Sequence, residues 1–120
     1  MLRYDSPVQL TSRRRKQPGT AGPVPVNPGE EVIVLLAAGN RDPGRFAQPD
    51  VFDPLRPVPG PLSFGAGPHF CIGAALARLE GAVAFPKLLA AFPALAPAGT
   101  AERRLGLILR GFETLPVPVC

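Results

Sequence analysis

The residue with the most distinctive chemistry is Cys71, which follows a short loop rich in glycine and proline. Gly65, Gly67 and Pro68 favour a tight turn, and the alanine- and leucine-rich run after the cysteine favours a helix. A thiol in the first turn of such a helix lies near the positive end of the helix dipole and beside unpaired backbone N–H groups, and both stabilise a thiolate. The sequence therefore predicts a soft anionic ligand on a rigid turn, among small residues that let a flat group approach.

Several other cysteine or glycine motifs do not fit this stretch. A phosphatase loop needs arginine after five intervening residues, where the chain has Ala77. A dinucleotide fingerprint needs glycine at the position of Phe70, and a phosphate loop needs a Gly-Lys-Ser/Thr run that the chain lacks. Zinc sites, thiol-redox motifs and disulfide frameworks need paired cysteines, whereas Cys71 and Cys120 lie far apart. We expect Cys120 to be a free thiol in the tail.

Four residues in ten match a known pattern, the Phe-x-x-Gly-x-x-x-Cys-x-Gly haem loop of the cytochromes P450: Phe64, Gly67, Cys71 and Gly73. The chain resembles the C-terminal portion of this family over essentially its whole length, and is closest to the bacterial branch. The resemblance implies one partial domain, residues 1–120, with an α+β fragment of the mainly helical P450 fold. Its parts would be short β-hairpins, a glycine-rich haem loop and one long helix after Cys71.

The resemblance also implies a cofactor site. Cys71 would be the axial thiolate ligand of the iron of haem b, and His69 and Arg13 would face the haem propionates, for which an arginine fork is well suited. Phe64 would pack near the sulfur and tune it, and Gly67 and Gly73 would complete the cofactor-binding set. In this family the thiolate pushes electron density onto iron and favours O–O cleavage. The implied reaction is O2-dependent monooxygenation of an organic substrate.

Two further surfaces follow from the resemblance. Val8, Gln9 and Leu10, together with Leu109 and Arg110, match segments that line a pocket for a small organic substrate; a plain edge strand is the alternative for residues 8–10. Arg78 matches the proximal surface, where a ferredoxin- or flavoprotein-type electron donor docks; an ordinary exposed helix arginine is the alternative.

One departure from the family concerns a buried salt-bridge network. Arg3 matches the arginine of the family's Glu-x-x-Arg pair, and Arg56 matches a second arginine that joins the pair. The glutamate would fall one residue before Met1. Because a buried charge left unpaired costs roughly 3–5 kcal/mol, we expect local instability or exposure of both arginines.

Composition and charge limit the classes of protein to which the chain can belong. The chain has 120 residues, of which 46% are hydrophobic and 18% charged, so a modest core is expected and disorder is not, although glycine and proline make up a quarter of the residues. The net charge is +4, and the basic run at residues 13–16 lacks the interleaved aromatics of a nucleic-acid site. No signal peptide or long apolar run is present, so we expect a cytoplasmic protein without nucleic-acid or membrane partners.

Patterning predicts the elements that position these residues. We expect the end of a helix at residues 2–5, a strand at 8–12, a strand at 31–38 whose apolar run is covered on both faces, and a helix at 41–46 capped by Asn40. Prolines at residues 17–29 weaken a hairpin there, leaving Val24 and Val26 extended. Phe46 and Phe52 anchor an irregular stretch that includes residues 49–57.

The second half of the chain is expected to be a helix followed by a hairpin. The helix runs from Cys71 to residue 91, with an apolar stripe, and Pro86 kinks or interrupts it before Phe92 and Pro93 end it. Residues 105–119 form a terminal hairpin around Arg110.

Two functional hypotheses remain. The chain is either the C-terminal part of a haem-thiolate monooxygenase that is inactive alone, or a truncated, non-catalytic fragment that is at most a weak haem-binding or interaction module. The distal helix that delivers protons to oxygen in this family is not found in these 120 residues. We therefore expect that the isolated polypeptide does not bind haem stably.

Overall fold

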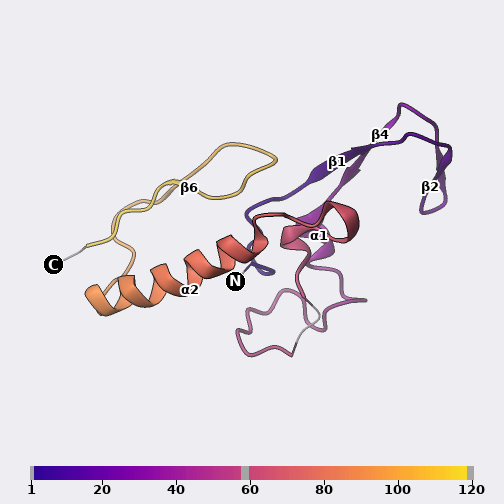
Figure 1. The fold of residues 1–120 in the computed structure, drawn as a ribbon. Coiled ribbons are helices and arrows are strands. Elements are labelled where there is room, and N and C mark those ends of the chain that lie inside the picture. The colour runs from indigo at the N-terminus through magenta and orange to yellow at the C-terminus, as the bar shows by residue number, and fades with distance from the viewer. Residues whose placement is uncertain (1, 58–59, 119–120) are drawn as a thin grey trace. The chain divides into compact units, whose positions relative to one another are not determined.

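A computed structural model describes residues 2–57 and 60–118 and divides the chain into two compact units (Figure 1). The first unit comprises Met1–Ser63 and Gly106–Arg110, and the second comprises Phe64–Leu105 and Gly111–Cys120. That they form one partial domain stays a prediction, and Cys120, expected to be a free thiol, lies outside the described residues.

Two antiparallel strand pairs form the sheet structure of the first unit. Strand β1 (Thr11–Arg14) pairs with β4 (Glu31–Val34), and β2 (Gly19–Ala21) pairs with β3 (Val24–Val26). The expected weakening of the β2–β3 hairpin is wrong. Ala21 and Val24 flank a two-residue turn and form the hydrogen-bonded pair, so the next pair, which contains Pro25, is a non-hydrogen-bonded one. A proline there removes no ladder bond.

The segment after β4 differs from the predicted strand and helix. The strand ends at Val34, and the short helix α1 (Leu36–Gly39) follows. The predicted helix at 41–46 is absent from the structure, and Asn40 is the C-terminal cap residue of α1, whose N–H donates to Leu36 O at 3.0 Å. Residues 41–46 form turns instead, because Pro43 disfavours helical geometry at the residue before it and an Asp42 carboxylate oxygen accepts the Gly44 N–H at 2.8 Å.

The N-terminal segments are also shifted from their predicted positions. Residues 2–4 form a turn rather than the end of a helix, and β1 begins at Thr11 rather than at residue 8. The apolar run in and after β4 is not covered on both faces: Ile33 is 60% and Leu35 57% exposed. Among the described residues β4 pairs with β1 alone, in a two-stranded ribbon.

A small core holds the first unit together. Phe46, Val26 and Leu36 are its buried apolar residues, which confirms Phe46 as an anchor, whereas Phe52 is 51% exposed and only stacks edge-on against Tyr4. The core also contains a polar cluster of Ser6, Asn40 and Ser63.

This polar cluster joins segments that are far apart in the sequence. The Asn40 amide nitrogen donates to Ser63 Oγ (3.0 Å) and Ser6 Oγ (3.3 Å), and its amide oxygen accepts the Leu62 N–H (2.7 Å). Ser6 and Ser63 are bonded to each other at 2.9 Å. Because every member finds a partner, the cluster can be buried without a large desolvation penalty.

The second unit contains one long helix and a short hairpin. Helix α2 (Ala74–Ala91) runs without interruption through Pro86 and ends at the cap residue Phe92, so the end was predicted correctly and an interruption was not observed. Strand β5 (Glu102–Arg103) pairs with β6 (Phe112–Thr114), which confirms a terminal hairpin. Its first strand begins earlier than predicted, and residues 107–109 belong to the first unit instead.

The predicted apolar stripe of α2 is exposed. The large apolar residues of the helix are 42–60% exposed, and they are Leu76, Leu79, Val83, Phe85, Leu88 and Leu89. Ala74 is the buried residue of the helix. Within the described residues, none of the helices has both the length and the apolar character that a membrane crossing requires.

Candidate functional site

The loop before Cys71 is a closed turn that only glycine can form easily. Gly65 and Gly67 have φ angles of 73° and 65°, in the left-handed region that favours glycine. The 3-10 helix η2 (Gly67–His69) fills the loop, and the Phe70 N–H donates to Gly67 O at 3.0 Å. The Cys71 N–H then donates to Phe64 O at 2.8 Å. This bond joins the two ends of the loop and fixes the main chain of the cysteine.

Cys71 lies before the helix rather than in its first turn. Helix α2 begins at Ala74 with Gly73 at its N-cap, and the Cys71 carbonyl accepts the Ala74 N–H at 3.2 Å. Gly73 is a poor helix former, which explains why the helix starts later than predicted. Since the dipole effect falls off within one turn, the closed loop is the main determinant of where the sulfur lies, and thiolate formation stays a prediction.

The surroundings of the thiol are open and apolar. Cys71 is a free, exposed cysteine, and its neighbours Phe70 and Ile72 are 48% and 103% exposed. A Cβ added at Gly67 would meet no atom within 4 Å, and one added at Gly73 would lie 3.9 Å from the Cys71 sulfur. These features fit a flat, largely apolar group with a metal ion that accepts a thiolate.

The ring of Phe64 is held from two directions. It meets the Phe70 ring edge-on, with centroids 6.4 Å apart, and the Arg78 guanidinium carbon lies 4.7 Å from its centroid. Phe64 therefore links α2 to the cysteine loop through its side chain and to Cys71 through its carbonyl. Sequence reasoning did not find this link, since Arg78 was considered only as a surface residue.

The two residues expected to bind haem propionates lie in different units. His69 is exposed at the end of η2 in the second unit. Arg13 is half-buried on β1 in the first unit, where its guanidinium donates to Thr11 Oγ1 at 2.9 Å and Ser12 O at 2.6 Å. Their shared role stays a prediction.

The two segments expected to line the substrate pocket do come together within the first unit. Val8 and Leu109 form an antiparallel bridge, and the Gln9 N–H donates to Ile108 O at 2.8 Å. Arg110 forms an ion pair with Asp5 at 2.7 Å. A cavity of about 430 Å³ adjoins this bridge, and residues of the candidate set that line it are Gln9 and Arg110. Leu10, the residue after Gln9, is half-buried.

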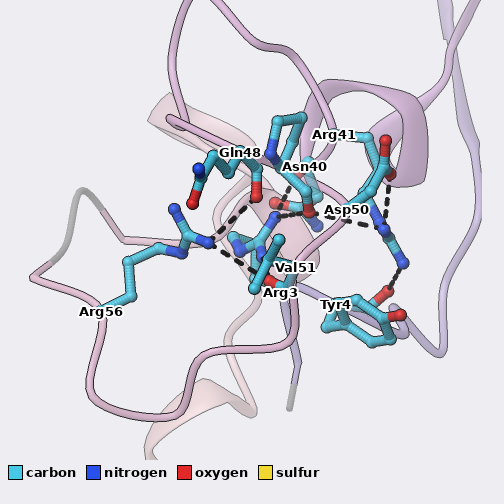
Figure 2. A network of polar contacts seen from close by, with 9 residues as sticks. Arg3, Tyr4, Asn40, Arg41, Gln48, Asp50, Val51 and Arg56 are labelled. Atoms are coloured by element: carbon cyan, nitrogen blue, oxygen red, sulfur yellow. Dashed lines mark hydrogen bonds and ion pairs between the residues drawn. The ribbon is translucent and has the colours of Figure 1, made fainter.

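Arg3 and Arg56 are half-buried and bind backbone carbonyls of the loop at residues 47–51 (Figure 2), so of the two predicted outcomes exposure is wrong and local instability stays a prediction. Arg3 donates to Asn40 O (2.9 Å), Pro49 O (2.8 Å) and Val51 O (3.3 Å). Arg56 donates to Ala47 O, Gln48 O (3.0 Å) and Val51 O (3.2 Å).

These two guanidinium groups therefore share one acceptor, the carbonyl of Val51. Burial, followed by the positive charges of Arg56 and Arg41, lowers the pKa of Arg3 below its ordinary value. Among the residues described, Arg56 Nε is buried without a hydrogen-bond partner. Carbonyl dipoles thus satisfy the two guanidinium groups only in part.

Arg41 is a third arginine of this region, and sequence reasoning missed it. Its guanidinium pairs with Asp50 at 2.7 Å, donates to Tyr4 O at 2.6 Å and lies 4.0 Å from the centroid of the Tyr4 ring (Figure 2). The only available signal was the sequence Asn40-Arg41-Asp42, which indicated a helix start instead.

Comparison with known proteins decides the family. The family model described as Cytochrome P450 matches residues 1–111. The chain belongs to the cytochrome P450 family. This match confirms the predicted resemblance and fold class. Members of this family are haem-iron monooxygenases. The short hairpins and the long helix of the described residues are therefore part of a mainly helical P450 fold, not an independent α+β fold.

Bacterial P450s match nearly the whole chain. Cytochrome P450 107B1 of Saccharopolyspora erythraea is 46% identical over 120 residues, covering 97% of this chain and 30% of the relative. The biotin biosynthesis cytochrome P450 of Bacillus subtilis is 44% identical over 117 residues, with the same coverage. The chain thus spans about 30% of the length of such relatives.

Solved P450 structures match equally well. P450BioI, in a crystal structure with an acyl carrier protein ligated to hexadec-9Z-enoic acid, has a TM-score of 0.89 and 44% identity over 97% of this chain and 30% of that one. CYP164A2 of Mycobacterium smegmatis, in its ligand-free state, has a TM-score of 0.88 and 47% identity with the same coverage.

The site fits the haem that this family uses. The part of the chain that the structure describes contains no cluster of three or more His, Cys, Asp or Glu side chains that could hold a metal ion. A P450 iron needs none, because one cysteine thiolate is its protein ligand. An open thiol between two exposed apolar side chains suits that role.

Proposed function

We propose that this chain forms the haem-thiolate portion of a cytochrome P450 monooxygenase, with Cys71 as the axial ligand of haem b. The observation that carries the proposal is the exposed sulfur of Cys71 at the end of a closed glycine loop, in a chain that belongs to the P450 family. The match of Phe64, Gly67, Cys71 and Gly73 to the family's loop pattern supports the same assignment.

Each residue of the loop has a separate task in this proposal. The bond from the Cys71 N–H to Phe64 O holds the sulfur in one position, and left-handed Gly67 keeps the loop free of side-chain bulk. Phe70 and Ile72 offer exposed apolar side chains next to the cysteine in sequence, against which a flat apolar group can pack. His69 and Arg13 bind the propionates. When bound, the haem supplies O2 activation, and the thiolate ligand favours O–O cleavage.

Substrate and electron donor belong to the proposal as well. We assign the bridge between residues 8–10 and Leu109–Arg110 to contact with a small organic substrate, because the structure brings these two segments together. One structural neighbour is a complex with an acyl carrier protein, so a carrier-bound substrate is among the candidates. Arg78 lies on the proposed docking surface for a ferredoxin or flavoprotein, and the proposed location is the cytoplasm.

A chimeric enzyme tests the cysteine assignment. Residues 1–111 replace the matching segment of the Bacillus subtilis relative, and the reduced, CO-bound spectrum is recorded after folding is verified by circular dichroism. A thiolate-type Soret band is expected, and Cys71→Ser should abolish it. A folded chimera that binds haem but keeps this band in Cys71→Ser would contradict the assignment.

The alternative, a non-catalytic fragment with at most weak haem binding, is favoured by the exposed apolar residues of α2. The isolated 120-residue chain tests it, because we expect haem to separate from the chain during gel filtration. Cys120→Ser is the matched control for Cys71→Ser, since it removes the second thiol outside the loop. Co-eluting haem with a thiolate-type Soret band that depends on Cys71 but not on Cys120 would overturn this expectation.

A further inference from the structure

Phe64 contacts both helix α2, through its ring, and Cys71, through its carbonyl. Its carbonyl accepts the Cys71 N–H at 2.8 Å, so any displacement of Phe64 is passed on to the main chain of the cysteine. The loop between them contains two glycines with positive φ, Gly65 and Gly67, which resist displacement poorly because they have many accessible conformations. The position of Cys71 therefore depends on what holds Phe64.

The side chain of Arg78 is one such support. The residue lies on the second turn of α2, and its guanidinium carbon is 4.7 Å from the centroid of the Phe64 ring. This distance is within the range of a cation–π interaction, which at an exposed site changes an equilibrium by about two- to five-fold. Phe70 makes a second contact to the same ring, in an edge-to-face arrangement.

We propose that Arg78 is a positioning residue for the cysteine loop: its guanidinium holds the ring of Phe64, and the carbonyl of Phe64 in turn holds Cys71. That this loop binds haem rests on the function proposed above, but the coupling itself does not. The proposal gives Arg78 a role within the chain that is separate from docking an electron donor. It requires a cation over the ring, not merely a long side chain.

Hydrogen exchange of the Cys71 amide in the full 120-residue chain measures this coupling, because it reports the opening of the bond to Phe64 O. In Arg78→Ala we expect about two- to five-fold faster exchange at Cys71. Arg78→Lys, which keeps a cation, should restore most of the protection, and Arg78→Met, which keeps only bulk, should not. Lys87→Ala is the matched control, since Lys87 is an exposed cation of α2 outside the loop.

A second background separates coupling from loss of structure. In Phe64→Leu the aromatic ring is gone, so Arg78→Ala should cause no further change at Cys71. Alanine is the best helix former, and unchanged exchange within α2 verifies that the helix is retained. Equal effects in both backgrounds, rescue by Met as complete as by Lys, or a Cys71 amide unprotected in the unaltered chain would each overturn the proposal. No haem is present in this experiment, so its outcome is independent of the spectrum of the chimera.

Discussion

Replacement of Asn40 by alanine tests whether the polar cluster holds the first unit together. Asn40 is fully buried, and its side chain makes three hydrogen bonds, to Leu62 N, Ser63 Oγ and Ser6 Oγ. Ser6 and Ser63 remain bonded to each other in Asn40→Ala, at 2.9 Å in the native structure. The group left without a partner is therefore the amide of Leu62.

The expected loss of stability follows from that amide and from the space left behind. A buried donor without a partner costs about 1–3 kcal/mol, and half-buried Leu62 lies in the lower half of this range because water reaches it more easily. A cavity of methyl size or more adds about 1 kcal/mol. We expect Asn40→Ala to lower the free energy of unfolding by about 2–3 kcal/mol.

Urea unfolding followed by tyrosine fluorescence measures this loss, because the chain has one tyrosine, Tyr4, in the first unit and no tryptophan. Asn27→Ala is the matched control: Asn27 is exposed, its side-chain bond to Glu30 is long at 3.4 Å, and the change should stay within about 0.5 kcal/mol. Equal losses in Asn40→Ala and Asn27→Ala would refute the view that the cluster stabilises this unit.

Three further predictions concern the loop, the helix and the arginines. Gly65→Ala places a side chain at a φ of 73°, with its Cβ 3.3 Å from a backbone oxygen, and should lower the free energy of unfolding by about 1–2 kcal/mol in calorimetry. Gly111→Ala, where a Cβ would meet no atom within 4 Å, should change it little. Pro86→Ala restores a helix N–H and should raise the helical circular dichroism signal of α2, with up to about 3 kcal/mol of added stability; an unchanged signal would argue against a strained turn. Salt screens Arg3 from Arg56 but also weakens the ion pairs of Arg41 and Arg110, so the readout is a difference: in urea unfolding at low and high salt, added salt should stabilise the unaltered chain relative to Arg3→Met.

The cysteine loop was predictable because its causes are local. Glycines at residues 65 and 67 permit left-handed φ angles, and the spacing of Phe64, Gly67, Cys71 and Gly73 is distinctive by itself. The start of the helix was less predictable, since alanine-rich sequence does not reveal that Gly73 is the N-cap.

Asn40 illustrates what could not be predicted. Asparagine is favoured at helix ends, and a following Arg-Asp-Pro run indicated the N-terminal end of a helix. The side chain instead bonds to Leu62 and two serines that are 22 or more residues away in sequence. Local propensity contains no information about such partners, so the prediction of Asn40 as the N-cap of a helix at 41–46 was wrong.

The arginine pair shows how a half-buried cation is tolerated without a carboxylate next to it. The prediction of local instability or exposure for Arg3 and Arg56 assumed that only a carboxylate could balance their charges. In the structure each guanidinium donates to three carbonyl oxygens, and the Val51 carbonyl accepts from both. Hydrogen bonds to charged groups contribute about 1.5–3 kcal/mol each, so several of them offset much of a 3–5 kcal/mol penalty.

The carbonyl oxygens do not fully compensate the burial of Arg3 and Arg56. Burial, followed by positive neighbours, still lowers the pKa of Arg3, and Arg56 Nε is still buried without a partner among the described residues. Because four of the five acceptor carbonyls belong to the loop at residues 47–51, the arginines also fix that loop, which has no helix or strand of its own. Arg3 and Arg56, which were expected to destabilise the chain, therefore hold the irregular part of the first unit in place. Replacing either of them should make the loop at residues 47–51 less ordered.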